Sequence, residues 1–244
     1  MPDNRFFIQI PNFEKNQLLS LEKEEFHHLA HVMRLKAGDT LELVNGMGSL
    51  AEASITSLEK HRASLAITSI HTEENSGYRL VLAQAFPRLP RLEYIIEKSV
   101  ELGVTELWLF PGSLSEKKEV SPSGLERLHH IALSAMKQCG RLFLPKIRLL
   151  PPLQKWTKED MPSQSFFGDT RPSAASFPTS LPNDSFMIVI GPEKGLQEKE
   201  IFYLETNLHM KGIQLHSNIL RTDTAAICAL SLASFYLQTN KNLH

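Results

Sequence analysis

Two glycines bracket a short loop in the C-terminal part of the chain, where a ligand could approach the backbone. The segment 188–200, IVIGPEKGLQEKE, runs from an apolar strand through Gly191 and Gly195 into a helix. Open α/β sheets bind ligands at the carboxyl ends of their strands, and glycine permits close approach to the main chain. An ordinary strand-to-helix turn has the same pattern. The loop has neither the GxxxxGK[ST] signature of phosphate-binding loops nor the GxGxxG of dinucleotide sites.

A second loop of the same kind lies at 215–226, LHSNILRTDTAA. It joins a short strand to the last helix, with Thr222 or Thr224 as the expected N-cap and Asp223 suited to the positive end of the helix dipole. Arg221 stands just outside this helix, where it could simply brace Asp223. Two such loops close together in the sequence predict a shared pocket.

The segment 137–148, KQCGRLFLPKIR, carries four basic residues and no acid. Together with basic residues at 88, 91, 117 and 118 it could follow a phosphate backbone, although a basic run is more often an ordinary solvated face. His27 and His31 are spaced for one face of a helix, but nothing in the sequence supplies the remaining ligands of a metal site. We therefore expect no metal.

The elements that position these loops follow two different patterns. Residues 5–70 contain strand-like runs at 5–10, 41–44, 50–55 and 63–70, one helix at 22–35 and an Asn-Gly hairpin signal at 45–48. The polar stretch 71–79 is the linker candidate. From residue 79 onward, strands at 79–86, 104–110, 186–190 and 212–215 alternate with helices at 91–102, 123–139, 198–209 and 224–238. This alternation predicts an α/β domain with a mostly parallel sheet.

Composition describes a globular chain without an obvious export signal. The 244 residues include 26 basic and 27 acidic side chains, only two cysteines, and no apolar run long enough to span a membrane. We therefore expect a cytoplasmic protein. The near-neutral total hides an uneven distribution, with 7 basic and 9 acidic residues in 1–72, 11 and 9 in 73–150, and 8 and 9 in 151–244. A neutral total therefore does not exclude RNA as a partner.

Five separated motifs, in one order, resemble those of a known family. EFHHLAHVMRLKAGD, RLEYIIEKSVELGV, ALSAMKQCGRLFLP, IVIGPEKGL and ILRTDTAA are similar to segments of the RsmE family, which methylates N3 of a uridine in 16S ribosomal RNA. The resemblance implies a PUA-like RNA-binding β-barrel at 1–72 and a SPOUT methyltransferase domain at 73–244, with a C-terminal trefoil knot. It further implies S-adenosylmethionine as cofactor, a homodimer, and ribosomal RNA within the assembled 30S subunit as substrate.

The resemblance and the chemistry together select candidate residues. A donor that stabilises negative charge on the uracil carbonyl oxygens suits the reaction, which makes Arg221 and Arg141 the catalytic candidates, with Glu193 as acid/base or orienting group. The cofactor-binding candidates are Gly191, Pro192, Glu193, Gly195, Leu196, Leu215, Ile219, Leu220, Thr222 and Thr224. The expected RNA contacts are Arg34, Arg88, Arg91, Lys117 and Arg141.

Among the departures from the family pattern in the cofactor loops, two replace glycines. The family shows GPEGGF and LGxRILRTETA, whereas this chain has Lys194 and His216 in place of glycines. If either glycine is needed for a positive φ or a close approach, cofactor affinity falls. A rival hypothesis is therefore a non-catalytic RNA-binding or ribosome-assembly module that has lost its cofactor. A third, a small-molecule methyltransferase, predicts activity on free uridine.

Overall fold

The computed structural model describes residues 4–75, 77–159, 161–178 and 185–241, and divides the chain into two compact units. The first unit holds the residues up to 76 together with Leu133–Leu144. The second holds Gly77–Ala132 and the residues from 145 onward. Across the described residues, no helix is both long and apolar enough to cross a membrane.

The first unit is built on a curled, mixed five-stranded sheet that forms a half-barrel. Its strands are β1 (Arg5–Phe7), β2 (Leu18–Glu22), β3 (Thr40–Val44), β4 (Ser49–Leu58) and β5 (Arg62–Thr72), in the order β1-β3-β4-β5-β2. β1 runs parallel to β3, and the other pairs are antiparallel. Alternate residues of β3, β4 and β5 are buried in one core, as the period of two in a half-buried strand requires.

Two features of the first unit differ from the sequence prediction. The edge strand β2 has no counterpart in it, because the pattern LLSLE starts with an exposed Leu18 and gives a poor alternation. The helix expected at 22–35 is shorter and irregular: α1 (Lys23–His27) continues into a π-helical turn, His28–Val32. The chain then leaves the helix through Arg34, which has a φ of 57°.

The turn between β3 and β4 is the predicted hairpin, and it also supports another segment of the first unit. Asn45 Oδ1 accepts hydrogen bonds from the N–H groups of Met47 and Ser49, which fixes the turn. The Gly48 N–H donates to the Leu142 carbonyl, and the Leu144 N–H donates to the Gly46 carbonyl. The two glycines, with φ of 71° and 99°, therefore leave room for the chain at 142–144.

The second unit is an α/β domain on a seven-stranded, all-parallel sheet. Its strands lie in the order β10-β12-β9-β11-β6-β7-β8. They are β6 (Arg79–Ala85), β7 (Glu106–Phe110), β8 (Lys146–Leu149), β9 (Ser165–Gly168), β10 (Ala175–Ser176), β11 (Ser185–Ile190) and β12 (Lys211–Gln214). This is the parallel sheet that the sequence predicts, with β8, β9 and β10 in addition.

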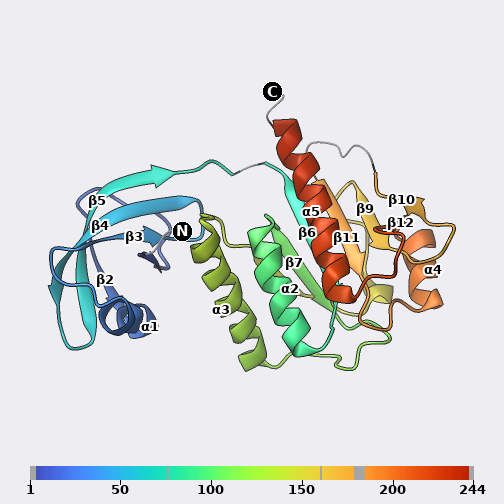
Figure 1. Cartoon of the computed structure of the whole chain (residues 1–244), viewed down its shortest axis with the longest axis horizontal. Helices are drawn as coiled ribbons and strands as arrows, with labels where there is room; N and C mark the ends of the chain where they lie inside the picture. Colours follow the sequence, from blue (N-terminus) through green and yellow to red (C-terminus); the bar gives the residue numbers. More distant parts are fainter. Residues whose placement is uncertain (1–3, 76, 160, 179–184, 242–244) are drawn as a thin grey trace. The chain divides into compact units, whose positions relative to one another are not determined.

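Helices cover both faces of this sheet (Figure 1). α2 (Leu89–Glu101) and α5 (Thr222–Lys241) pack together, and α5 lies against β6 and β11. On the other face, α4 (Glu198–Thr206) and the 3-10 turn Leu153–Lys155 bury an apolar cluster centred on Phe110, Trp156 and Phe167. α3 (Pro122–Cys139) begins with a serine cap, since the Gly124 N–H donates to Ser121 Oγ at 3.1 Å, and is followed by Gly140, with a φ of 88°.

A methyl group at Gly48 should destabilise the protein more than one at Gly38. Both glycines have strongly positive φ, but a Cβ at Gly48 would lie 2.8 Å from Phe143 Cε1 and 2.9 Å from the Glu73 carbonyl, whereas a Cβ at Gly38 meets nothing within 4 Å. Gly38→Ala should therefore cost about 1 kcal/mol of backbone strain, and Gly48→Ala about 1 to 3 kcal/mol more. Urea denaturation measures the difference, and equal losses would show that the 142–144 segment does not press on this turn.

Candidate active site

Three loops enclose a cavity of about 350 Å³ at one end of the parallel sheet. They follow the carboxyl ends of β9, β11 and β12, which are neighbours in the sheet, and line the cavity with residues 168–171, 190–196 and 214–220. Ile201, Thr222 and Ala225 complete the lining. The shared pocket predicted from the two loop sequences is therefore present, with a third loop that the sequence analysis did not identify.

Glycine is required where the first loop turns back on itself. A Cβ at Gly191 would lie 2.9 Å from both the Gly195 carbonyl carbon and the Leu196 nitrogen, so no other residue fits there without moving the backbone. Gly195 has a φ of 76° and donates its N–H to the Pro192 carbonyl at 2.8 Å. The bracketing glycines thus produce a tight turn whose backbone lines the cavity.

A buried hydrogen-bond network joins this loop to the start of α5. Thr222 Oγ1 donates to the Gly191 carbonyl at 2.7 Å and accepts from Gln84 Nε2 at 3.0 Å. The Gln84 side chain, fully buried in β6, also donates to the Gly191 carbonyl at 3.3 Å. Because the backbone N–H and C=O groups of a buried loop need partners, these bonds fix both loops in one arrangement.

This network corrects the expected N-cap of the last helix. Thr222 is the first residue of α5, and its hydroxyl bonds to Gly191 instead of capping the helix. The Arg221 carbonyl accepts the helical hydrogen bond of the Ala225 N–H at 2.8 Å, so Arg221 occupies the cap position. Thr224 is exposed within the first turn and does not line the cavity.

The loop after β9 brings a buried carboxylate to the cavity. Asp169 is 5% exposed and accepts from Arg171 Nε and Nη2, while Arg171 also pairs with Glu205. Hydrogen bonds to Asp169 and Glu205 raise the pKa of Arg171 above its ordinary value. A Cβ at Gly212 would lie 2.9 Å from that of Asp169, so the glycine makes room for this side chain. The only sequence signal for it is an acid directly after the short segment SFFG at 165–168.

The structure gathers most of the predicted cofactor residues around the cavity. Nine of the ten line it, all except Thr224. Arg221 is exposed between two lining residues, Leu220 and Thr222. The other catalytic candidate, Arg141, is half-buried and belongs to the first unit, as does Arg34.

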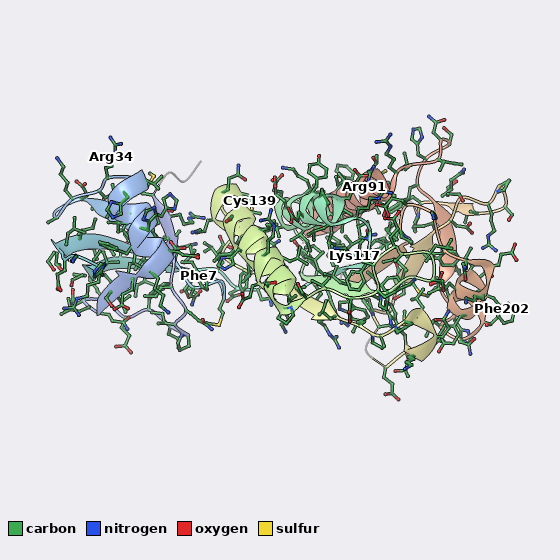
Figure 2. The ribbon with its side chains drawn as sticks, turned by 90° about the horizontal axis from the view of Figure 1, so that it is seen from below. Phe7, Arg34, Arg91, Lys117, Cys139 and Phe202 are labelled. Carbon is green, nitrogen blue, oxygen red and sulfur yellow. The ribbon has the colours of Figure 1, made fainter. Side chains whose placement is uncertain are left out.

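The predicted RNA contacts of the second unit, of which Figure 2 labels Arg91 and Lys117, have different surroundings. Arg88 is exposed and paired with Glu116 at 2.9 Å, and this pairing lowers the pKa of the Glu116 carboxyl. Arg91 is half-buried between Glu193 and Asp223. Lys117 is exposed and makes no ion pair with any described residue. In the described part of the chain, no group of three or more His, Cys, Asp or Glu side chains is arranged to hold a metal ion.

Comparison with known proteins decides the family. The family model described as "RNA methyltransferase domain" matches residues 73–234, and that described as "RNA methyltransferase PUA domain" matches 21–68. Ribosomal RNA small subunit methyltransferase E of Bacillus subtilis is 30% identical to the chain over 248 residues, covering 95% of this chain and 96% of the relative. The chain belongs to the RsmE family. The Rickettsia conorii RsmE protein is 27% identical, with 95% of each chain covered.

Solved structures of related proteins share the fold over nearly the whole chain. RsmE from Neisseria gonorrhoeae, solved with S-adenosyl methionine bound, is 27% identical and superposes with a TM-score of 0.83 over 95% of this chain and 97% of that one. A Legionella pneumophila protein in complex with SAM is also 27% identical, with a TM-score of 0.85 over 97% of each chain. The second unit therefore has the SPOUT methyltransferase fold of this family. The trefoil knot stays a prediction.

Neither of the two residues that replace family glycines has a strained backbone conformation. Lys194 and His216 both line the cavity, and neither has a positive φ. His216 Nδ1 accepts the Asn218 N–H at 3.0 Å, which stabilises its own turn. The residues that do require glycine, Gly191 and Gly195, are retained. The backbone at Lys194 and His216 therefore gives no structural reason to expect that the cavity has lost its ligand.

Replacing Thr222 by valine should loosen the site from within. Thr222→Val keeps the shape but leaves the Gly191 carbonyl and Gln84 Nε2 short of a partner in a buried place, which should cost about 1 to 3 kcal/mol of unfolding free energy. Thr224→Val, two residues away and exposed, is the matched control and should change stability by less than about 0.5 kcal/mol. Equal effects in urea denaturation would contradict a fixed network at Thr222.

Proposed function

We propose that the chain transfers a methyl group from S-adenosylmethionine to N3 of one uridine in small-subunit ribosomal RNA. The observation that carries the proposal is the cavity formed by loops 190–196 and 214–220, in a chain of the RsmE family. Relatives with the same fold have been solved with this cofactor bound.

The lining of the cavity fits a cofactor of this kind. Its volume of about 350 Å³ lies in the range of roughly 300–1,000 Å³ that small-molecule sites occupy. Gly191 offers a bare backbone at the tight turn, where a side chain has no space. The loops present backbone N–H and C=O groups that can bond a purine, and Leu196, Leu215 and Leu220 supply apolar surface.

The chemistry needs an aligned nucleophile and a stabilised anion. When bound, S-adenosylmethionine would supply an electrophilic methyl group on a sulfonium: the methyl carbon bonds to uracil N3 as the S–CH3 bond breaks, the N3 proton passes to solvent, and the thioether S-adenosylhomocysteine leaves. Arg221 lies at the rim of the cavity, beside Leu220 and Thr222, where its guanidinium can donate to a uracil carbonyl oxygen that gains negative charge. Arg141 is the second candidate donor. The positive end of α5 disfavours a neighbouring sulfonium, and is better suited to a carboxylate or an RNA phosphate.

The same proposal divides the work along the chain. Residues 1–72 act as the RNA-binding domain and 73–244 as the methyltransferase domain, which the family matches at 21–68 and 73–234 support. Arg34 is exposed in the first unit and available to phosphate. The protein works as a homodimer in the cytoplasm, on ribosomal RNA within the assembled 30S subunit.

Incubation with methyl-labelled cofactor and small ribosomal subunits that lack the modification tests this function. The label should appear on N3 of a single uridine, and heat-denatured protein serves as the control. Label on free uridine would support a small-molecule methyltransferase. A non-catalytic module would give no label and no thermal shift, whereas cofactor at about 100 times its Kd should add roughly 2.7 kcal/mol of stability to the enzyme.

Arg221→Ala should lower activity strongly without unfolding the protein. The Arg221 side chain is exposed, and it makes no hydrogen bond or ion pair with the described residues, so the unfolding free energy should change by less than about 0.5 kcal/mol. Loss of a donor to the developing charge should lower kcat on the order of 10²-fold. Single-turnover methylation measures the rate, and a rate within a few-fold of wild type would remove Arg221 from the mechanism.

A further inference from the structure

We propose that Arg91 is a positioning residue of the cofactor cavity: it fastens the loop 191–196 to the start of α5 and does not serve as an RNA contact. The inference rests on the proposed function, because it concerns how the cavity holds its cofactor. Sequence alone assigns Arg91 to a basic RNA-facing surface. In the structure its guanidinium instead contacts two acidic side chains, Glu193 of the cavity loop and Asp223 at the start of α5.

Arg91 bridges two elements that meet at the cavity. Its Nη1 donates to Asp223 Oδ1 at 2.9 Å, and its Nε lies 3.5 Å from Glu193 Oε1. The same Glu193 oxygen accepts the N–H of Arg88, the residue before α2, at 3.0 Å. Glu193 belongs to the glycine-bracketed loop and Asp223 to the first turn of α5. Arg91 itself, in the first turn of α2, does not line the cavity.

The electrostatics explain why the three side chains stay together. Each carboxylate lies at the positive end of a helix, Glu193 at α2 and Asp223 at α5, and the guanidinium lies between them. The side chains of Arg91, Glu193 and Asp223 are only 30%, 30% and 21% exposed, so water screens their attraction less than at an open surface. Because the Arg91 guanidinium is already paired with two carboxylates, it is less available to bind an RNA phosphate.

The bridge needs an arginine. A guanidinium presents its Nε and Nη groups in different directions and can bond two separate carboxylates, whereas an ammonium is a compact point charge on a flexible stem. Arg91→Lys therefore keeps the charge and loses the bridge. If Arg91 contacted RNA phosphate instead, lysine would replace it well, because a phosphate contact depends mainly on charge.

Arg91 also acts in concert with the buried network of Gln84 and Thr222. Thr222 holds the Gly191 end of the loop from inside the fold, and Arg91 holds Glu193, two residues later, nearer the surface. Both side chains tie the loop to the first turn of α5. Arg91 belongs to α2, and Thr222 accepts a hydrogen bond from Gln84 of β6, the strand before α2. This makes Glu193 an orienting group whose carboxylate is already engaged, and not the acid/base considered from sequence.

Isothermal titration calorimetry with S-adenosylmethionine alone, without RNA, tests the inference. Arg91→Met and Arg91→Lys should both weaken the cofactor Kd by about tenfold, because the bridge that shapes the cavity is lost in each. Arg127→Met is the control: Arg127 also donates through Nε and Nη2 to one carboxylate, that of Glu93, but neither residue lines the cavity. It should leave the cofactor Kd unchanged.

A double-mutant cycle and RNA binding supply the decisive outcomes. In an Asp223→Asn background, Arg91→Met should cost clearly less cofactor affinity than in the wild type, since the partners act together. The salt dependence of RNA binding should stay unchanged in Arg91→Met. A cofactor Kd within about twofold of wild type, together with a salt slope reduced by about one unit, would identify Arg91 as an RNA contact and overturn the inference.

The melting temperature of each ligand-free variant separates positioning from general stability. The Arg91 variants should have melting temperatures close to that of Arg127→Met but a weaker cofactor affinity. If the Arg91 variants bound the cofactor as tightly as Arg127→Met and differed from it only in melting temperature, Arg91 would not be a positioning residue. Failure of the proposed function gives a different result, because wild-type protein would then show no heat of cofactor binding.

Discussion

The hydrogen bond from Thr222 to the Gly191 carbonyl is the contact on which the arrangement of the site depends. It joins the end of β11 to the start of α5, two segments separated by α4 and β12. Parallel strands leave their terminal backbone groups at one edge of the sheet, where sheet hydrogen bonding ends. Here a buried threonine and a buried glutamine supply the missing partners. The hydrogen bonds that satisfy the backbone groups of these loops therefore help to define the cavity.

Much of this architecture is predictable from the sequence because the signals are local. Gly191 and Gly195 mark the tight turn, Asn45–Gly48 the hairpin, and apolar strands alternating with helices the parallel sheet. The elements that sequence reasoning misses are short or irregular, such as β9, β10 and the edge strand β2. Asp169 was missed with β9, because a two- to four-residue strand has too few positions to show a period. The local loop sequences predict the shared pocket, whereas only the family resemblance implies which cofactor it holds.

Charge counting was a poor guide to the basic residues, for a reason visible in the ion pairs. Residues 73–150 contain more bases than acids, yet Arg88, Arg91 and Arg127 each have a carboxylate partner distant in the sequence. Such pairings depend on which helices and loops meet in the fold. A one-dimensional count therefore overstates the positive surface available to phosphate, and a residue such as Lys117 stands out only once the pairs are known.

The insertion of residues 142–144 against the β3–β4 turn bears on how the protein is made. The Gly46 carbonyl and the Gly48 N–H form their hydrogen bonds with this segment. In the same unit, Lys137 Nζ of α3 lies 2.6 Å from Glu25 Oε1. The first unit is thus discontinuous in the chain. During synthesis its sheet can form early, but it acquires these contacts only after the ribosome has released a long stretch of the second unit. A fragment cut at the end of β5 would keep every strand of the half-barrel and still lack part of its natural packing.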